Sequence, residues 1–235
     1  MISIKNTNIE SIRQTAKSLL RVEPQHSGIE SFVYHPFFMS NPMFLKDEDG
    51  ERFVDIFDKE SFDKVVKMYD KALERAKDVW TLYILINKPY RTLFFKLIRN
   101  DLSEKDYNEM LADCWTSTEN PNQDANVMVR QWYSYFRKAN KEILMEKEEY
   151  NIYKTLPEKI KVYRGVGKGR NPKGLSWTTD REVAEWFAKR WGNDKAYMFE
   201  GYCNKENVLA YFNRRSEKEL IIGFKDIIDL KKVVL

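Results

Sequence analysis

Two glutamates close to the end of the chain have a spacing that suggests chemistry. Glu217 and Glu219, in the string SEKELII, stand two residues apart at the start of an apolar run that reads as a strand. In a strand, residues i and i+2 project from the same face, so both carboxylates are expected to point the same way. A carboxylate is suited to stabilising positive charge that develops in a transition state. The pair therefore marks a candidate catalytic site.

Two further polar islands interrupt apolar strand patterns in the same region. Arg164 closes the run KIKVYRG, and Ser176 and Thr178 lie in GLSWTTD. A guanidinium makes paired hydrogen bonds to phosphate or carboxyl groups, and small hydroxyl side chains can hold a carboxylate without filling a cleft. A solvated strand end, an N-cap region and surface charge are the ordinary alternatives. Together the three islands fit the glycosidic cleavage of a dinucleotide, which needs anion binding and a carboxylate beside a sugar cation.

The order of these motifs resembles the ADP-ribosyltransferase superfamily, in the class defined by an Arg–Ser–Glu motif. That family has an aromatic-Arg-Gly strand, a Ser-x-Ser/Thr strand leading into a helix with an Ala-x-x-Phe-Ala pattern, and a Glu-x-Glu motif that opens a late strand. The matching residues of this chain are Tyr163-Arg164-Gly165, Ser176-Trp177-Thr178, Ala184 to Ala188, and Glu217-Lys218-Glu219. The resemblance covers about residues 156–235 and depends on three motifs in order, since any one alone is weak.

The resemblance implies that NAD is the substrate and that ADP-ribose passes to a macromolecular acceptor, with protein arginine favoured. Arg164 would bind NAD through a phosphate or the nearby ribose, and Ser176, with Thr178 beside it, would order the pocket and hold Glu219. Glu219 would favour the oxocarbenium-like transition state as nicotinamide leaves, and Glu217 would activate the acceptor. The same resemblance makes further residues candidates for contacts with NAD: Tyr163, Gly165, Trp177, Phe187, Arg190 and Trp191.

Two loops of the family supply the remaining candidates. The stretch VLAYFNRR corresponds to the substrate-recognition loop, which makes Tyr211 and Phe212 candidates for acceptor contacts, and AKRWGNDK corresponds to the phosphate–nicotinamide loop. Ordinary packing or surface charge is the alternative in both loops. Trp177 departs from the better-known members, which carry Thr there, and the β-rich part is short for the family. The polar loop CWTSTENPN, residues 114–122, could line the cleft or simply end a helix.

The first part of the chain has the periodicity of helices. Between about residues 61 and 150, apolar residues recur at steps of three and four, for example from Val65 to Tyr83, as one helix face requires. Pro89 and Pro121 predict breaks between helices. Earlier, the string MFLKDEDGERFVDIF predicts a short hairpin at 43–57 around an Asp-Gly turn.

After Pro157 the runs become short and β-rich, with one helix that Asp180 can cap. The predicted class is therefore α+β. A mostly helical N-terminal region, residues 1–155, is expected to precede a compact β-sandwich core of the ADP-ribosyltransferase type at 156–235. A helical region ahead of the core is similar to phage-encoded and intracellular-effector members of the family.

Composition narrows the class further. The chain is 43% hydrophobic, which is ample for a core, and its net charge of +4 suits an anionic ligand but not a protein that coats nucleic acid. Cys114 and Cys203 form no C-x-x-C pair, so no disulfide framework or zinc site is indicated. With no apolar leader or membrane-spanning run visible, we expect a cytoplasmic protein.

Other signals point away from metal and from nucleotide loops. His26 and His35 lie far from the motifs, and no metal is expected. The string RGVGKGRNPKG fails both the P-loop pattern and, because Arg170 replaces the last glycine, the dinucleotide pattern. NAD hydrolysis alone and transfer to a nucleic-acid base stay open as alternative reactions. A non-catalytic module that binds NAD or other anions through Lys168, Arg170 and Lys173 stays open as well.

Overall fold

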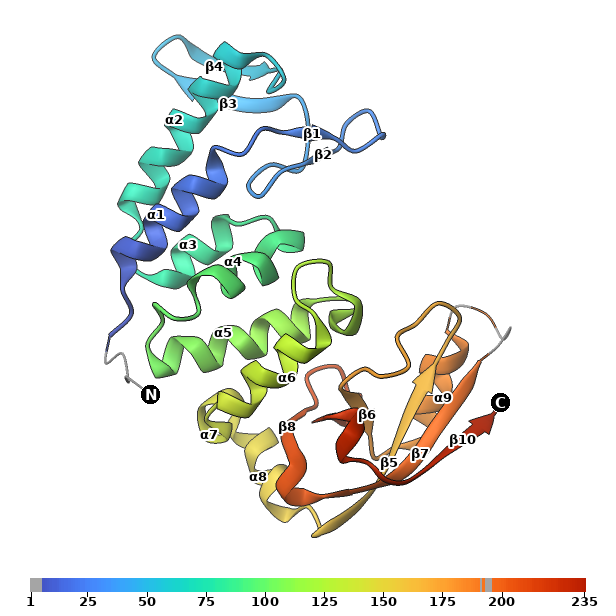
Figure 1. Ribbon diagram of the computed structural model, residues 1–235. Helices are drawn as coiled ribbons and strands as arrows, with labels where there is room; N and C mark the ends of the chain where they lie inside the picture. Colours follow the sequence, from blue (N-terminus) through green and yellow to red (C-terminus); the bar gives the residue numbers. More distant parts are fainter. Residues whose placement is uncertain (1–5, 191, 193–195) are drawn as a thin grey trace. The chain divides into compact units, whose positions relative to one another are not determined.

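The protein is described by a computed structural model that covers residues 6–190, 192 and 196–235 (Figure 1). The chain divides into two compact units, Met1–Asp106 and Tyr107–Leu235. The change from helix to strand comes near Pro157, as predicted. The compact unit that contains the sheet begins much earlier, at Tyr107, so the predicted boundary at 155/156 separates kinds of secondary structure and not the two units.

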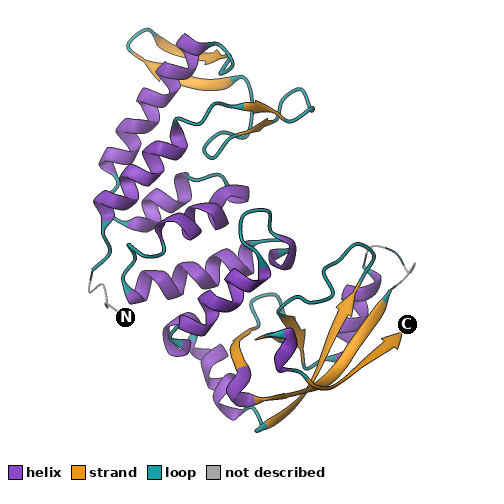
Figure 2. Cartoon of the chain, viewed as in Figure 1, coloured by secondary structure: helices purple, strands orange, loops and turns teal. Residues whose placement is uncertain are grey.

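The first unit combines helices with two small sheets (Figure 2). The predicted hairpin is confirmed, because its two strands pair from Met43↔Val54 to Asp47↔Gly50. The predicted run from Val65 to Tyr83 is two helices, because Asp78 interrupts it and accepts a hydrogen bond from the Thr81 N–H. The elements are α1 (Ile9–Leu20), β1 (Gln25–His26), β2 (Val33–Tyr34), β3 (Met43–Asp47), β4 (Gly50–Val54), α2 (Lys59–Arg75), α3 (Val79–Leu85), the 3-10 turn η1 (Lys88–Tyr90) and α4 (Arg91–Ile98).

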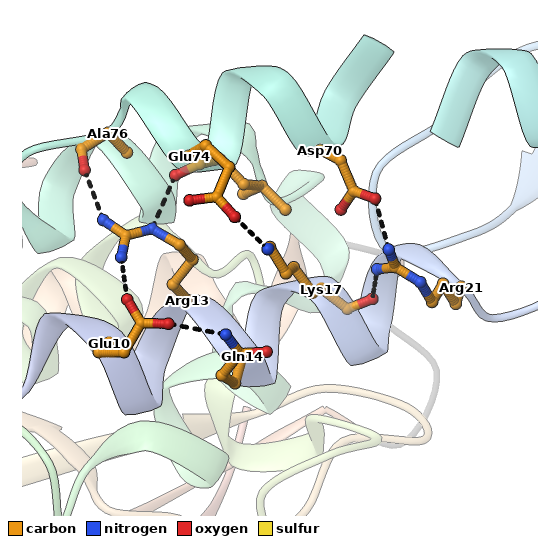
Figure 3. A network of polar contacts seen from close by, with 9 residues as sticks. Glu10, Arg13, Gln14, Lys17, Arg21, Asp70, Glu74 and Ala76 are labelled. Atoms are coloured by element: carbon orange, nitrogen blue, oxygen red, sulfur yellow. Dashed lines mark hydrogen bonds and ion pairs between the residues drawn. The ribbon is translucent and has the colours of Figure 1, made fainter. Parts of the chain in front are cut away.

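A row of polar contacts ties α1 to α2 (Figure 3). Arg13 of α1 donates from Nε to the carbonyl of Leu73 at 3.0 Å and from Nη2 to that of Ala76 at 2.9 Å. The last carbonyls of a helix have no partner inside it, so Arg13 caps the end of α2. Two ion pairs extend the row: Lys17–Glu74 and Arg21–Asp70.

The second unit begins within a helix and ends in a sheet. Breaks at the two prolines are confirmed, since η1 and the 3-10 turn η2 each contain one of them in their first turn. The helical elements are α5 (Glu104–Ser117), which crosses the unit boundary, η2 (Pro121–Gln123), α6 (Val129–Lys138), α7 (Lys141–Leu144), α8 (Lys147–Thr155), α9 (Arg181–Lys189), η3 (Lys205–Asn207) and η4 (Phe224–Asp226). The strands are β5 (Lys159–Val166), β6 (Ser176–Thr178), β7 (Tyr197–Asn204), β8 (Val208–Phe212), β9 (Glu219–Ile222) and β10 (Ile228–Val234).

The six strands form one antiparallel sheet in the order β10-β7-β5-β6-β9-β8. This order confirms the α+β class. The expected sandwich of two sheets is corrected in one respect: hydrogen bonding joins all six strands, although the two halves meet at a single pair, Tyr163↔Thr178. The three strands β5, β6 and β9 are consecutive neighbours, and they carry the three predicted motifs.

Helix α9 packs closely on β5 because two glycines make room for it. A Cβ on Gly165 would lie 1.9 Å from the carbonyl oxygen of Ala184, and one on Gly167 would lie 2.9 Å from that of Ala188. Such distances are far below van der Waals contact. The Tyr-Arg-Gly motif of β5 and the Ala-x-x-Phe-Ala motif of α9 therefore meet in one close backbone contact. Asp180 caps α9, as predicted, by accepting from the N–H groups of its first turn.

Helices α5 and α6 form an aromatic cluster in the core of the second unit. Trp115 lies edge-on to Trp132 and to Phe136, with ring centroids 5.5 Å and 5.2 Å apart. The cluster continues to Phe212 of β8. No helix in the described ranges combines the length and apolar character that crossing a membrane requires.

Candidate functional site

A cleft of about 840 Å³, including space open to solvent, lies on the central strands of the second unit. Its wall is built from β5, β6, α9, the segment around η2 and the turn before β9. Arg164, Ser176 and Glu219, on three neighbouring strands, all line it. Residues separated by more than fifty positions in sequence thus share one cavity.

Glu219 is the most buried carboxylate of the cleft, with 7% of its surface exposed. Its Oε1 accepts a hydrogen bond from the indole Nε1 of Trp115 at 3.2 Å. Burial raises the pKa of Glu219, while hydrogen bonds from Ser176 and Trp115 and the charge of Arg215 act in the opposite direction. The charge of Glu217 adds to the rise. Burial and the neighbours of Glu219 therefore act on its pKa in opposite directions.

Glu217 lines the same cleft, but it does not lie in a strand as the sequence predicted. Strand β9 begins at Glu219, so Glu217 lies in the preceding turn and the i, i+2 rule for strands does not apply. Its neighbours Ser216 and Lys218 have left-handed backbones, with φ of 57° and 46°. Residues other than glycine rarely adopt this conformation, and it often marks functional turns. The Arg215 guanidinium pairs with the Glu217 carboxylate at 3.1 Å.

Side-chain contacts fix the turn that carries Glu217. Asn213 Oδ1 accepts from the Lys218 N–H at 3.0 Å, and the Asn213 N–H donates to buried Glu149 of α8 at 2.9 Å. From β6, the Thr178 hydroxyl donates to the Glu217 carbonyl at 2.9 Å. Thr178 thus holds the backbone of Glu217, whereas the resemblance places it beside Ser176 as a support for Glu219.

Arg164 is buried, with 7% of its surface exposed, and it braces the wall of the cleft. Its Nη1 donates to the carbonyl of Ser176 and its Nη2 to that of Asn171, both at 2.7 Å. Burial lowers the pKa of Arg164 to about 10, and the negative charge of Glu219 opposes that shift. The guanidinium is still cationic at neutral pH. It fixes the loop between β5 and β6 and places a positive charge at the base of the cleft.

Ser176 is held from outside the β-rich region. Asn122 of η2 donates from Nδ2 to the Ser176 hydroxyl oxygen at 2.8 Å, and its Oδ1 accepts from the Leu175 N–H at 2.6 Å. A Cβ on Gly174 would lie 2.6 Å from that same Oδ1. Both alternatives for the segment 114–122 hold: α5 ends within it, and its last residues line the cleft.

Sequence reasoning missed Trp115 and Asn122 as individual site residues. Both come from the helical segment, and the amphipathic pattern classes Trp115 as ordinary core. A usable signal was present, since a buried tryptophan normally finds a hydrogen-bond partner for its indole N–H. That signal says a partner is needed but does not say which one.

The remaining candidates for NAD contacts lie in or near the cleft. Tyr163, Gly165, Trp177, Phe187 and Arg190 contribute to its lining. The ring of Trp177 is buried against Phe224, 6.2 Å away, so it serves the core as well. Arg190 forms an ion pair with Glu119 at 3.0 Å across the cleft wall. Trp191 lies outside the described residues.

Tyr211 and Phe212 are not where the resemblance places them. They belong to β8 and are 5% and 2% exposed, so neither presents a surface to a macromolecule. Phe212 packs against Phe136 in the aromatic cluster. The predicted role in acceptor recognition is therefore corrected to packing, because the apolar run VLAYF is a strand and the loop begins only after it.

Three arginines that line the cleft, Arg170, Arg190 and Arg215, are called its basic rim here, and two of them are paired with lining carboxylates: Arg190 with Glu119 and Arg215 with Glu217. Within the described ranges, no group of three or more His, Cys, Asp or Glu side chains is arranged to hold a metal ion. The arrangement offers a basic rim for an anionic ligand and a buried carboxylate that can stabilise a cation.

Comparisons of the chain with protein-family models, curated proteins and solved structures found no match. The case for a function therefore depends on the cleft itself.

Proposed function

We propose that the protein is an NAD-dependent mono-ADP-ribosyltransferase whose favoured acceptor is protein arginine. One observation carries this proposal: Arg164, Ser176 and Glu219 line a single cleft from three adjacent strands, with Glu217 at its edge. The resemblance of the motifs to the Arg–Ser–Glu class predicts that convergence, and their order alone does not require it. A sheet whose halves meet at one residue pair is also compatible with the sandwich-like core of that family.

The proposed reaction uses each group in a defined way. The bond between the nicotinamide nitrogen and the ribose C1′ breaks, and nicotinamide leaves with the bonding electrons. The cationic sugar that develops is stabilised by the Glu219 carboxylate. A guanidinium nitrogen of the acceptor then bonds to C1′ and loses a proton, which Glu217 accepts. The basic rim of the cleft would attract the diphosphate of NAD.

The ionisation of Glu219 fits this scheme. Burial favours the protonated acid in the free protein, whereas the positive charge on the nicotinamide ring of NAD favours the carboxylate. Binding of NAD would thus place the negative charge at the moment when the reaction needs it. A buried carboxylate near a bound cation is worth more than an exposed one because water screens it less.

The test is transfer of label from NAD to protein in a cell lysate. Wild-type protein should release nicotinamide and label an acceptor, and Glu219→Gln should lower kcat/KM by about 100-fold or more. Glu206→Gln is a matched control, because Glu206 is exposed on η3 and is not part of the cleft lining. Absence of both label and nicotinamide release with folded wild-type protein contradicts the proposal.

Glu217→Gln separates the reactions that share this chemistry. If protein arginine is the acceptor, this variant should lose transfer while it still cleaves NAD. Equal loss of both activities would indicate that Glu217 serves the donor sugar instead. Label found in nucleic acid, and not in protein, would indicate transfer to a base.

A non-catalytic anion-binding module is the candidate from another class. Lys168 and Lys173 are exposed beside the cleft, and Arg170 lines it. Such a module would bind NAD without turnover and with a steep dependence on salt. Measurement of bound NAD and of released nicotinamide in the same sample distinguishes the two.

A further inference from the structure

Glu219 has two neutral hydrogen-bond donors, and one of them comes from a helix far away in sequence. The Trp115 indole on α5 reaches it across 104 sequence positions. The indole is fully buried and held edge-on between Trp132 and Phe136, at interplanar angles of 83° and 85°. Because neighbours on two sides fix the ring, its N–H points in one direction. That direction is the Glu219 carboxylate.

The second donor is Ser176, and the direction of its hydrogen bond can be deduced. A backbone N–H can only donate, so the atom of Asn122 that contacts the Leu175 N–H must be the amide oxygen. The other end of Asn122 is then its NH₂ group, which donates to the Ser176 oxygen. With its oxygen accepting from Asn122, the Ser176 hydroxyl keeps its own hydrogen to donate, and the Glu219 carboxylate lines the same cleft. Interaction with Ser176 lowers the pKa of Glu219, as a donated hydrogen bond would.

We infer that Trp115 and Asn122 are positioning residues, which hold the Glu219 carboxylate at the base of the cleft through a chain of hydrogen bonds with a fixed direction. The chain runs from Asn122 through Ser176 to Glu219, and Trp115 donates to Glu219 from the other side. The contacts of Trp115 with Glu219 and of Asn122 with Ser176 are seen in the structure, and the link from Ser176 to Glu219 is part of the inference. The importance of this chain of hydrogen bonds for turnover rests on the proposed function.

A purely structural role for Trp115 explains less. Two other tryptophans of the second unit, Trp132 and Trp177, are equally buried, and their indole N–H groups have no partner in the described structure. Trp115, by contrast, donates to the Glu219 carboxylate, whose pKa burial raises. Both donors favour the ionised carboxylate, which is the form the proposed reaction needs.

Charged groups around Glu219 also influence its ionisation and must be kept constant in a test. Arg164 approaches from β5, and Arg215 and Glu217 approach from the turn before β9. Arg170, Arg190 and Glu119 line other parts of the cleft. A variant that removes one neutral donor leaves all of these charges in place.

The first experiment measures the titration of Glu219 by NMR in ¹³C-labelled protein, with Glu219→Gln used to assign the signal. Trp115→Phe should raise the pKa of Glu219, because it removes a donor to the carboxylate and keeps an aromatic ring in the cluster. Trp132→Phe is the matched control: it shortens a neighbouring indole of the same cluster but removes no donor to Glu219. Equal pKa shifts in the two variants, or no shift in Trp115→Phe, overturn the inference.

Asn122→Asp provides a second variant should Trp115→Phe fail to fold. Aspartate still accepts from the Leu175 N–H but cannot donate to Ser176, so the Ser176 hydroxyl should turn toward residue 122. The pKa of Glu219 should rise again. Because the new charge contributes to that rise, Asn122→Leu, which removes the donor without adding charge, should show a rise in the same direction. An unchanged pKa in both variants contradicts the relay.

The second experiment measures turnover. Trp115→Phe should lower kcat by about 10-fold or more, since a hydrogen bond to a charged group is lost, with little change in KM for NAD. The limb of the pH profile set by Glu219 should move to higher pH, which Trp132→Phe should not cause. If wild-type protein never cleaves NAD, the proposed function fails and the NMR titration still decides the relay. If Glu219→Gln abolishes turnover and Trp115→Phe leaves the pKa unchanged, the relay alone fails.

Discussion

His35 in the first unit and Glu219 in the second are both buried titratable side chains, and their surroundings differ in kind. His35 is fully buried and stacked on Phe38. Its Nδ1 accepts from the Phe37 N–H at 3.0 Å, which leaves Nε2 to donate to the Val22 carbonyl at 2.8 Å. The surroundings of His35 therefore match the neutral imidazole at both nitrogens.

The surroundings of Glu219 do not match a single protonation state. Burial favours the acid, and the Trp115 and Ser176 donors favour the carboxylate. Local conflicts of this kind cost stability and are expected at functional sites, whereas agreement at every contact is typical of structural positions. The comparison shows that burial alone does not mark a functional group. A better mark is whether the hydrogen bonds of the group favour the same protonation state as its burial.

The largest expected effect tests whether the two units can be compared as separate bodies. Gly165→Ala places a methyl group 1.9 Å from the Ala184 carbonyl oxygen and should cost the second unit about 4 kcal/mol or more. Amide hydrogen exchange, measured separately in residues 6–106 and 107–235, should show loss of protection in the second unit only. Gly169→Ala, in open space at φ 72°, should cost about 1 kcal/mol. Equal loss in both units would show that they unfold together.

The next prediction concerns acid and the first unit. Burial lowers the pKa of His35 from its ordinary value of 6.5 to about 4, so the unfolded chain binds a proton that the folded unit excludes. Stability of the first unit should therefore fall as the pH drops from about 6.5 to 4, by up to about 3 kcal/mol. Urea unfolding across this range measures it. His35→Gln should remove the slope, while His26→Gln, at an exposed position, should keep it.

The second unit should respond to pH in the opposite sense. Because the pKa of Glu219 is raised on folding, the folded unit keeps a proton that the unfolded chain releases. Its contribution to stability is complete below the ordinary value of 4.5 and is lost as the pH rises through the folded pKa. Glu219→Gln should hence be more stable than wild type at neutral pH and no more stable near pH 4. A difference that does not vary with pH would contradict the raised pKa.

The smallest effects are expected in the contacts between α1 and α2. Lys17→Ala removes an ion pair whose Glu74 partner is 57% exposed, and it should change the free energy of unfolding by less than about 0.5 kcal/mol. Arg13→Ala should cost more, about 1–2 kcal/mol, because two carbonyls at the end of α2 lose their donor. Thermal unfolding of the two variants in parallel checks the order. A larger loss for Lys17→Ala would show that the surface ion pair outweighs the cap.

The sequence predicted the parts of the fold and of the site that depend on local pattern. The motif strands, the helix capped by Asp180 and the hairpin around Gly50 follow from short-range periodicity and turn chemistry, and the structure has them. The convergence of Arg164, Ser176 and Glu219 followed from the resemblance and not from periodicity. Tyr211 and Phe212 were wrongly assigned to a loop, because the sequence does not show where the apolar strand VLAYF ends and the loop after it begins.

The sequence could not predict long-range contacts or unusual backbone conformations. No sequence pattern predicts that Ser216 and Lys218 adopt left-handed backbones. The prediction that Glu217 lies in a strand was therefore wrong, although Glu217 does line the cleft. Trp115 and Asn122 carry no local mark of their partners. Their roles depend on the packing of a helix on a sheet, which only the folded chain specifies.

Trp115 and Asn122 stand close together in the chain, at the end of α5 and in η2, and this has a consequence for where the second unit can be divided. Replacement of the strands alone would remove the contacts of Trp115 with Glu219 and of Asn122 with Ser176 at once. A fragment that keeps the cleft together with these contacts must therefore include α5 and η2 as well as the sheet.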